Sequence, residues 1–137
     1  MTGADRRAEL VAGLADVRAR IAAACAAAGR PPSDVQLVAV TKTFPVADVL
    51  LLQELGVLDM GENKDAEAAA KAAQVPDVRW HFVGQLQTNK ARSVASYARV
   101  VHSLDRPRLA RALAEGARRA DRVVDVLVQV NLDVDVP

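Results

Sequence analysis

Apolar residues recur at two different spacings along the chain, and the alternation of these spacings predicts an ordered series of strands and helices. In residues 5–28 they fall at three- and four-residue steps, which is typical of an amphipathic helix. Thr2 and Asp5 are placed to form a capping box at its start, and Gly29 suits its end. Strands are then expected at residues 36–43, 57–61, 79–87, 100–104 and 123–132, and helices at residues 46–55, 64–74, 89–98 and 107–121.

Helices between short strands indicate parallel pairing through right-handed crossovers, which either an open doubly wound sheet or a (β/α)8 barrel provides. No Gly-x-Gly-x-x-Gly follows the first strand, and no Gly-x-x-x-x-Gly-Lys-Ser/Thr is present. Polar residues such as Lys42, Asn63 and Gln85 instead gather at the strand ends that form the mouth of a barrel. The sequence therefore predicts an α/β fold, a (β/α)8 TIM-type barrel with about the first five β/α units present. Residues 1–137 would form one C-terminally incomplete domain, opened by a helix.

Composition excludes several classes of function. A net charge of +1 and an aromatic content of 3% do not provide the basic, base-stacking surface of a nucleic-acid-binding protein. A single cysteine, Cys25, excludes an intrachain disulfide and falls on the apolar stripe of the first helix. The sequence shows neither a signal peptide nor a stretch apolar enough to span a bilayer. We therefore expect a cytoplasmic protein without nucleic-acid or membrane partners.

Lys42 closes the first predicted strand, and its position makes it the candidate nucleophile. Strand side chains alternate between two faces, so Lys42 shares a face with Val38 and Val40 and is expected to point into the core. Burial lowers the pKa of a lysine toward the neutral amine, which attacks a carbonyl carbon to form a Schiff base. The alternative is a lysine at a strand end whose charged head reaches water.

Two more polar residues lie at corresponding depth on the neighbouring predicted strands. Asn63 and His81 could donate hydrogen bonds to a ligand oxygen, and His81 could exchange protons near neutral pH. Their structural alternatives are a helix cap for Asn63 and a hydrogen-bonded core histidine for His81. No metal site is expected, because His81 and His102 lie on different strands without a third ligand close in sequence. Trp80 and Phe82, on the opposite strand face, are assigned to packing against helices.

Three motifs together resemble the pyridoxal phosphate homeostasis protein family. They are Val40-Thr41-Lys42-Thr43, Gly61-Glu62-Asn63 and Trp80-His81-Phe82-Val83-Gly84-Gln85-Leu86-Gln87-Thr88-Asn89-Lys90. The resemblance extends from the first helix to Asn131, with Val83 at a position where isoleucine is common in the family. It implies the pyridoxal-phosphate-binding barrel of the alanine racemase N-terminal domain.

The resemblance also implies how the cofactor is held. Lys42 would carry pyridoxal 5′-phosphate as a Schiff base, with Asn63 near the cofactor and residues 81–90, including His81 and Gly84, beside the ring. The implied function is a carrier or regulator in vitamin B6 homeostasis without established catalysis, with the cofactor and the apoenzymes that accept it as partners. Family members continue for about three more strands, which carry the segments that bind the cofactor phosphate.

Two other functions would use the same lysine. A pyridoxal-phosphate-dependent racemase or lyase of this barrel needs an acid or base on the opposite cofactor face, and the one tyrosine, Tyr97, is expected inside a helix away from the mouth. A Schiff-base aldolase acting on a phosphorylated sugar needs a phosphate site that this sequence does not show. We therefore expect cofactor binding without turnover, and we predict no catalytic residue.

Overall fold

The structure is a computed structural model that describes residues 2–133 and residue 135. Five strands form one parallel sheet: β1 (Ala39–Val40), β2 (Asp59–Glu62), β3 (Arg79–Phe82), β4 (Ala98–Leu104) and β5 (Asp125–Val128). The helices are α1 (Gly3–Ala28), α2 (Val46–Glu54), α3 (Asp65–Gln74), α4 (Ala91–Ala95) and α5 (Pro107–Arg119), with short 3₁₀ turns η1 (Pro32–Asp34) and η2 (Thr88–Lys90). In the part of the chain described here, no helix is both long and apolar enough to cross a membrane.

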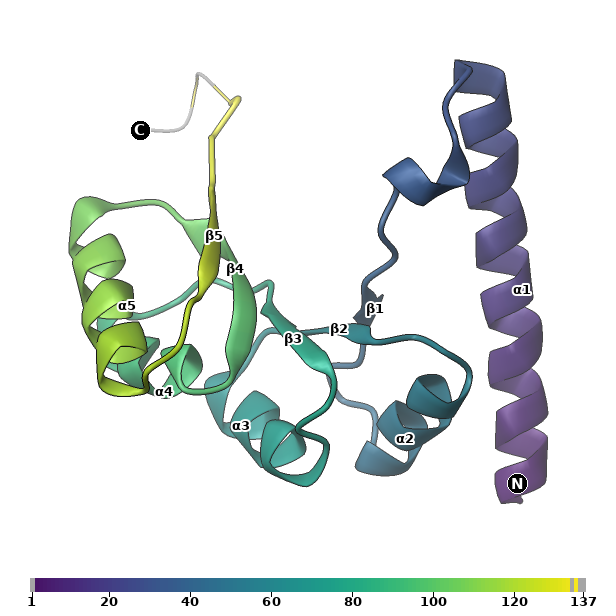
Figure 1. The fold of residues 1–137 in the computed structure, drawn as a ribbon, viewed down its shortest axis with the longest axis horizontal. Helices are drawn as coiled ribbons and strands as arrows, with labels where there is room; N and C mark the ends of the chain where they lie inside the picture. Colours follow the sequence, from purple (N-terminus) through teal and green to yellow (C-terminus); the bar gives the residue numbers. More distant parts are fainter. Residues whose placement is uncertain (1, 134, 136–137) are drawn as a thin grey trace.

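The order of the strands decides between the two predicted architectures. The strands lie side by side as β1-β2-β3-β4-β5, each parallel to the next. A doubly wound sheet reverses its strand order at a switch point, whereas a barrel adds each strand beside the preceding one. Figure 1 shows α2 to α5 along one side of the sheet and α1 beside the β1 edge. The prediction of the first five units of a TIM-type barrel behind an N-terminal helix is confirmed.

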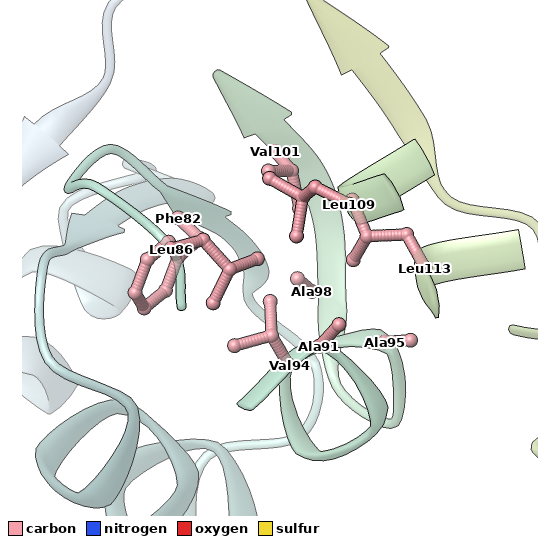
Figure 2. Packing of buried hydrophobic residues seen from close by; sticks show 9 residues of the cluster. All are labelled: Phe82, Leu86, Ala91, Val94, Ala95, Ala98, Val101, Leu109 and Leu113. Atoms are coloured by element: carbon pink, nitrogen blue, oxygen red, sulfur yellow. The ribbon is translucent and has the colours of Figure 1, made fainter. Parts of the chain in front are cut away.

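Side chains on the helix side of the sheet form two apolar clusters. One joins β3 and β4 to α4 and α5, as Figure 2 shows, and it contains Phe82, Leu86, Ala91, Val94, Ala95, Ala98, Val101, Leu109 and Leu113. The other packs Trp80 and Met60 against α2 and α3. Trp80 is 2% exposed, and its Nε1 donates a hydrogen bond to Val75 O at 3.1 Å. Trp80 and Phe82 therefore pack against helices, as predicted.

Predicted and observed elements agree best at the first helix and least at strand ends. Helix α1 has the predicted capping box between Thr2 and Asp5, and Gly29 ends it with a φ of 67°, in the left-handed region that glycine favours. Strand β1 is much shorter than residues 36–43, because it is an edge strand with β2 as its partner. Residues 83–87 leave the sheet, and the helix expected at residues 89–98 is divided into η2 and α4.

The opposite side of the sheet, which we call the inner face, is not covered by a helix within the described residues. Val38, Val40 and Val83 surround Gly61 there, since a Cβ added to Gly61 would lie 3.4–3.5 Å from all three side chains. Val40 is 50% exposed, and every residue of β5 is exposed. The inner face and the outer edge of β5 are thus both open in the described part of the chain.

Candidate functional site

Lys42 lies at the carboxyl edge of the sheet, in a turn that begins two residues after β1 ends. Its side chain is exposed, so the prediction that Lys42 is held in the core is wrong for this structure. The reason is that β1 stops at Val40 and that the inner face has no opposite wall among the described residues. Thr41 takes the buried position on the helix side, whereas Lys42, which follows it in the turn, is exposed.

A buried ion cluster lies behind Lys42, between the sheet and α3. Lys71 Nζ is 3.0 Å from Glu62 Oε2 and 2.8 Å from Glu67 Oε1, and the Thr41 hydroxyl donates a short hydrogen bond to Glu62 Oε2. Lys71 is 4% exposed and Glu62 is 1% exposed. Burial lowers the pKa of Lys71, but hydrogen bonds to Glu67 and Glu62 outweigh burial and raise that pKa above its ordinary value. Lys71 is therefore a charged ammonium and not a nucleophile.

The cluster also holds the backbone on both sides of Lys42. Lys71 Nζ donates a hydrogen bond to Thr41 O at 2.8 Å, and the Thr43 amide donates one to Glu67 Oε1 at 2.6 Å. These hydrogen bonds from Lys71 and Thr43 lower the pKa of Glu67. Thr43 has a φ of 69°, in the left-handed region that β-branched residues rarely adopt. The turn that carries Lys42 is thus strained, and its backbone is held by hydrogen bonds to Lys71 and Glu67.

Sequence reasoning missed Glu67 and Lys71 as parts of the site. Their spacing of four residues on α3 is a signal for a helical ion pair, but such pairs are common on exposed helix faces. Glu62 belongs to the strand-end motif Gly61-Glu62-Asn63, which by itself does not indicate an ion pair. The distinguishing signal would have been that Lys71 falls on the buried side of α3, together with Ala68 and Ala72.

Asn63 and Gly84 are in direct contact at the carboxyl ends of β2 and β3. A Cβ added to Gly84 would lie 2.7 Å from Asn63 O and 2.8 Å from Asn63 Cβ, closer than real Cβ atoms approach such atoms. Asn63 does not cap α3, because the N-cap position is Lys64 and no side chain caps the helix. The helix-cap alternative for Asn63 is therefore wrong, and Gly84 is needed for the close approach of the two loops.

We expect Gly84→Ala to displace Asn63 and to lower the free energy of unfolding by about 1–3 kcal/mol, the usual cost of overpacking. The added methyl would meet backbone atoms of Asn63, which cannot rotate away. Urea unfolding measures the change. Gly13→Ala in α1 is the control for an unhindered methyl: outside its own helix backbone nothing lies within 4 Å of the added Cβ, and alanine should stabilise the helix by about 1 kcal/mol. A Gly84→Ala variant at least as stable as the unchanged protein would contradict the contact.

His81 lies on the inner face, and both of its ring nitrogens have partners in the chain. Nε2 is 2.9 Å from Asp59 Oδ1, and Nδ1 is 2.9 Å from His102 Nε2. Arg79 Nη2 lies 2.7 Å from Asp59 Oδ2. Burial raises the pKa of Asp59, but hydrogen bonds from Arg79 and His81 outweigh burial and place that pKa well below its usual range. The carboxylate is therefore ionised beside His81.

This arrangement matches the alternative of a hydrogen-bonded core histidine for His81. Its predicted contact with a cofactor stays a prediction. Burial and the neighbouring His81 lower the pKa of His102. The two histidines meet because β3 and β4 are neighbours in the sheet, although 21 residues separate them in sequence. Within the described residues, no group of three or more His, Cys, Asp or Glu side chains is arranged to hold a metal ion.

Tyr97 lies in the turn between α4 and β4, not inside a helix as predicted. The reason is that α4 is short and ends at Ala95. The Tyr97 hydroxyl donates a hydrogen bond to Asp65 Oδ1 at 2.9 Å, and Asp65 begins α3. Burial and the charge of Asp65 raise the pKa of Tyr97 far above its ordinary value. The phenol is therefore directed to the helix side of the sheet.

The structure brings Asn63 together with the polar segment that follows β3. A hollow of about 410 Å³ at the carboxyl edge lies between the two loops, and its polar lining residues are Asn63, Lys64, Asp65, Gln85, Gln87 and Lys90. Lys42 does not line this hollow. Gly84 contacts Asn63 beside it, whereas His81 is buried among the neighbouring strands. Of the four predicted cofactor-binding residues, which come from β3 and from the segments after β1, β2 and β3, only Asn63 lines this hollow.

Comparisons with known proteins show which family this chain resembles. Residues 13–135 match the family described as "Alanine racemase, N-terminal domain". The chain is 39% identical to the pyridoxal phosphate homeostasis protein of Mycobacterium leprae, over 96% of this chain and 58% of the relative. It is 44% identical to the protein of that name from Corynebacterium glutamicum, over 87% of this chain and 57% of the relative. The chain therefore spans less than two thirds of the length of these relatives.

A solved structure shares the fold. The structure of PipY from Synechococcus elongatus with pyridoxal phosphate bound superposes with a TM-score of 0.70 and a sequence identity of 37%, covering 86% of this chain and 56% of PipY. The resemblance predicted from the three motifs is confirmed.

Proposed function

Because the chain belongs to the alanine racemase N-terminal domain family, we propose that it binds pyridoxal 5′-phosphate through Lys42 and acts in vitamin B6 homeostasis. The observation that carries the proposal is an exposed lysine at the carboxyl edge of a barrel-type sheet, in a chain similar to proteins named for pyridoxal phosphate homeostasis. The cofactor supplies an aldehyde that a lysine amine can bind as a Schiff base.

The residues present fit the aldehyde and the ring of this cofactor. Lys71 is buried and paired with carboxylates, so it is not available as the amine. Lys42 is exposed at the carboxyl edge of the sheet, where barrel enzymes bind their ligands. The contact between Asn63 and Gly84 places a polar side chain, that of Asn63, next to the glycine backbone of residue 84 at the carboxyl edge of the sheet. In this proposal Asn63, His81 and Gly84 lie beside the ring of the cofactor.

We further propose that the protein carries the cofactor and does not turn over a substrate. The names of the relatives support a homeostatic role. The Tyr97 hydroxyl is bound to Asp65 on the helix side, which does not favour the racemase alternative. We also propose that residues 1–137 are part of one barrel domain, that further strands provide the phosphate site, and that the protein acts in the cytoplasm and delivers the cofactor to apoenzymes.

Borohydride trapping tests the role of Lys42. We expect the folded chain, mixed with pyridoxal 5′-phosphate and reduced, to carry the pyridoxyl group on Lys42, and we expect Lys42→Ala to remove that label. Peptide mass spectrometry identifies the labelled residue. The same chain unfolded in urea is the control, in which Lys42, Lys64, Lys71 and Lys90 should react alike. Preferred labelling of another lysine would overturn the assignment, and racemisation of amino acids would overturn the non-catalytic role.

A further inference from the structure

The two peptide groups that flank the Cα atom of Lys42 are held by one ion pair, between the buried Lys71 and the partly exposed Glu67. The carbonyl of Thr41 belongs to the peptide before Lys42, and it accepts a hydrogen bond from Lys71 Nζ at 2.8 Å. The amide of Thr43 belongs to the peptide after Lys42, and it donates to Glu67 Oε1 at 2.6 Å. Since peptide groups are planar, their orientations fix φ and ψ of the residue between them.

We propose that the cluster of Glu62, Lys71 and Glu67 is a positioning device that fixes the backbone of Lys42 and thereby aims its amine. The inference rests on the proposed function, because it assigns these residues a role in the reactivity of Lys42. The three residues act from behind the sheet and do not touch the cofactor. Nothing in the comparisons assigns them this role.

Lys42 receives little support from the sheet itself. Strand β1 ends at Val40, and the last sheet-like hydrogen bond before the turn runs from Thr41 N to Gly61 O at 2.9 Å. The Lys42 side chain is exposed, so packing does not orient it. Without other contacts, the backbone of this turn would sample many conformations. The hydrogen bonds from the cluster restrict it to one.

The conformation of Thr43 supports the same inference. A β-branched residue at a φ of 69° is disfavoured, and such residues persist where surrounding contacts over-determine them. The contact in question is the hydrogen bond from the Thr43 amide to Glu67, which is itself held by Lys71 at 2.8 Å. The strained residue directly follows the proposed Schiff-base lysine.

Each member of the cluster has a distinct part. Glu62 is buried on β2, and its Oε2 binds both Lys71 Nζ and the Thr41 hydroxyl. Glu62 therefore anchors Lys71 to the sheet, and Lys71 connects that anchor to the Thr41 carbonyl and to Glu67. Glu67 is the partly exposed member that reaches Thr43, so it can be changed with little effect on the core.

Glu67→Ala and Glu67→Gln together test the proposal. Alanine favours helices, so α3 should remain folded, but the alanine variant loses the acceptor for the Thr43 amide. We expect hydrogen exchange at this amide, measured by NMR, to become about tenfold faster, as for a lost hydrogen bond to a charged group. The rate of borohydride trapping at Lys42 should fall at least threefold in parallel. Glu67→Gln keeps an acceptor oxygen, so both the exchange rate at the Thr43 amide and the trapping rate at Lys42 should return close to those of the unchanged protein.

Arg122→Met is the control for a general loss of stability. Arg122 Nη1 donates hydrogen bonds to Ala95 O at 2.7 Å and Ala98 O at 2.9 Å, and it contacts neither neighbour of Lys42. We expect this variant to be less stable in urea but to retain the Thr43 exchange rate and the Lys42 trapping rate. Equal effects of Glu67→Ala and Arg122→Met on these two rates would overturn the positioning role.

The same data separate this inference from the proposed function. If the unchanged protein is not trapped at Lys42, the proposed function fails, whereas the exchange rates at Thr43 still show whether Glu67 fixes the turn. If the unchanged protein is trapped at Lys42 and Glu67→Ala is trapped at the same rate, the positioning role alone fails. If Glu67→Ala is trapped more slowly at Lys42 and Glu67→Gln restores the trapping rate, the result supports both the proposed function and the positioning role.

Discussion

Replacing Lys71 by methionine is expected to lower the free energy of unfolding by about 3–5 kcal/mol, the cost of leaving a buried charge without its partner. Glu62 is 1% exposed, and its Oε1 has no hydrogen-bond partner among the described residues. Without Lys71, the charge of Glu62 would be compensated only by the Thr41 hydroxyl. Methionine has a similar length, so the change removes the charge more than the packing. Urea unfolding at neutral pH gives the value.

Two variants show whether the loss comes from charge. In Lys71→Met combined with Glu62→Gln, the buried carboxylate is gone, and we expect much of the lost stability to return. Arg118→Met breaks an exposed ion pair with Glu115, so it should change stability little. If Lys71→Met lowers the free energy of unfolding as little as Arg118→Met does, the ions of the cluster are not energetically coupled.

The fold was predictable because its main signals are local. The periodic apolar residues of α1, its capping box and Gly29 each specify a helix over a short stretch. The extent of β1 was not predictable, because a strand continues only as far as its neighbour offers hydrogen bonds. Residues 36–38 have strand-like composition, yet β1 pairs with β2 only through Ala39 and Val40.

The site was predictable in outline and not in its contacts. The position of Lys42 at a strand end follows from the sequence, whereas its exposure depends on which walls surround the inner face. Asparagine is a common helix N-cap residue, but in α3 the N-cap position is taken by Lys64, the residue after Asn63. The contacts of Glu67 with Thr43 and of His81 with His102 join residues more than 20 positions apart. Tertiary packing decides such contacts, and local pattern does not encode them.

We expect the 137-residue chain to bind pyridoxal 5′-phosphate much more weakly than its longer relatives do. A barrel of this type closes with eight strands, and the described residues form five. Val40 is 50% exposed on the inner face, and Val128 is 70% exposed on the last strand. The resemblance implies that later strands hold the phosphate. A Schiff base without those contacts is a reversible bond open to water.

Each charge-assisted contact to the phosphate is worth about 1.5–3 kcal/mol, so its loss weakens binding roughly 10- to 150-fold. Equilibrium dialysis compares this chain with the full-length Mycobacterium leprae relative, which is 39% identical to it. The matched control is that relative shortened to the region aligned with this chain. The shortened relative should bind as weakly as this chain does, because both would have Lys42 or its counterpart and neither would have the later strands. Affinity of this chain equal to that of the full-length relative would place the phosphate contacts within residues 1–137, and the hollow beside Asn63 and Lys64 would then be their first candidate.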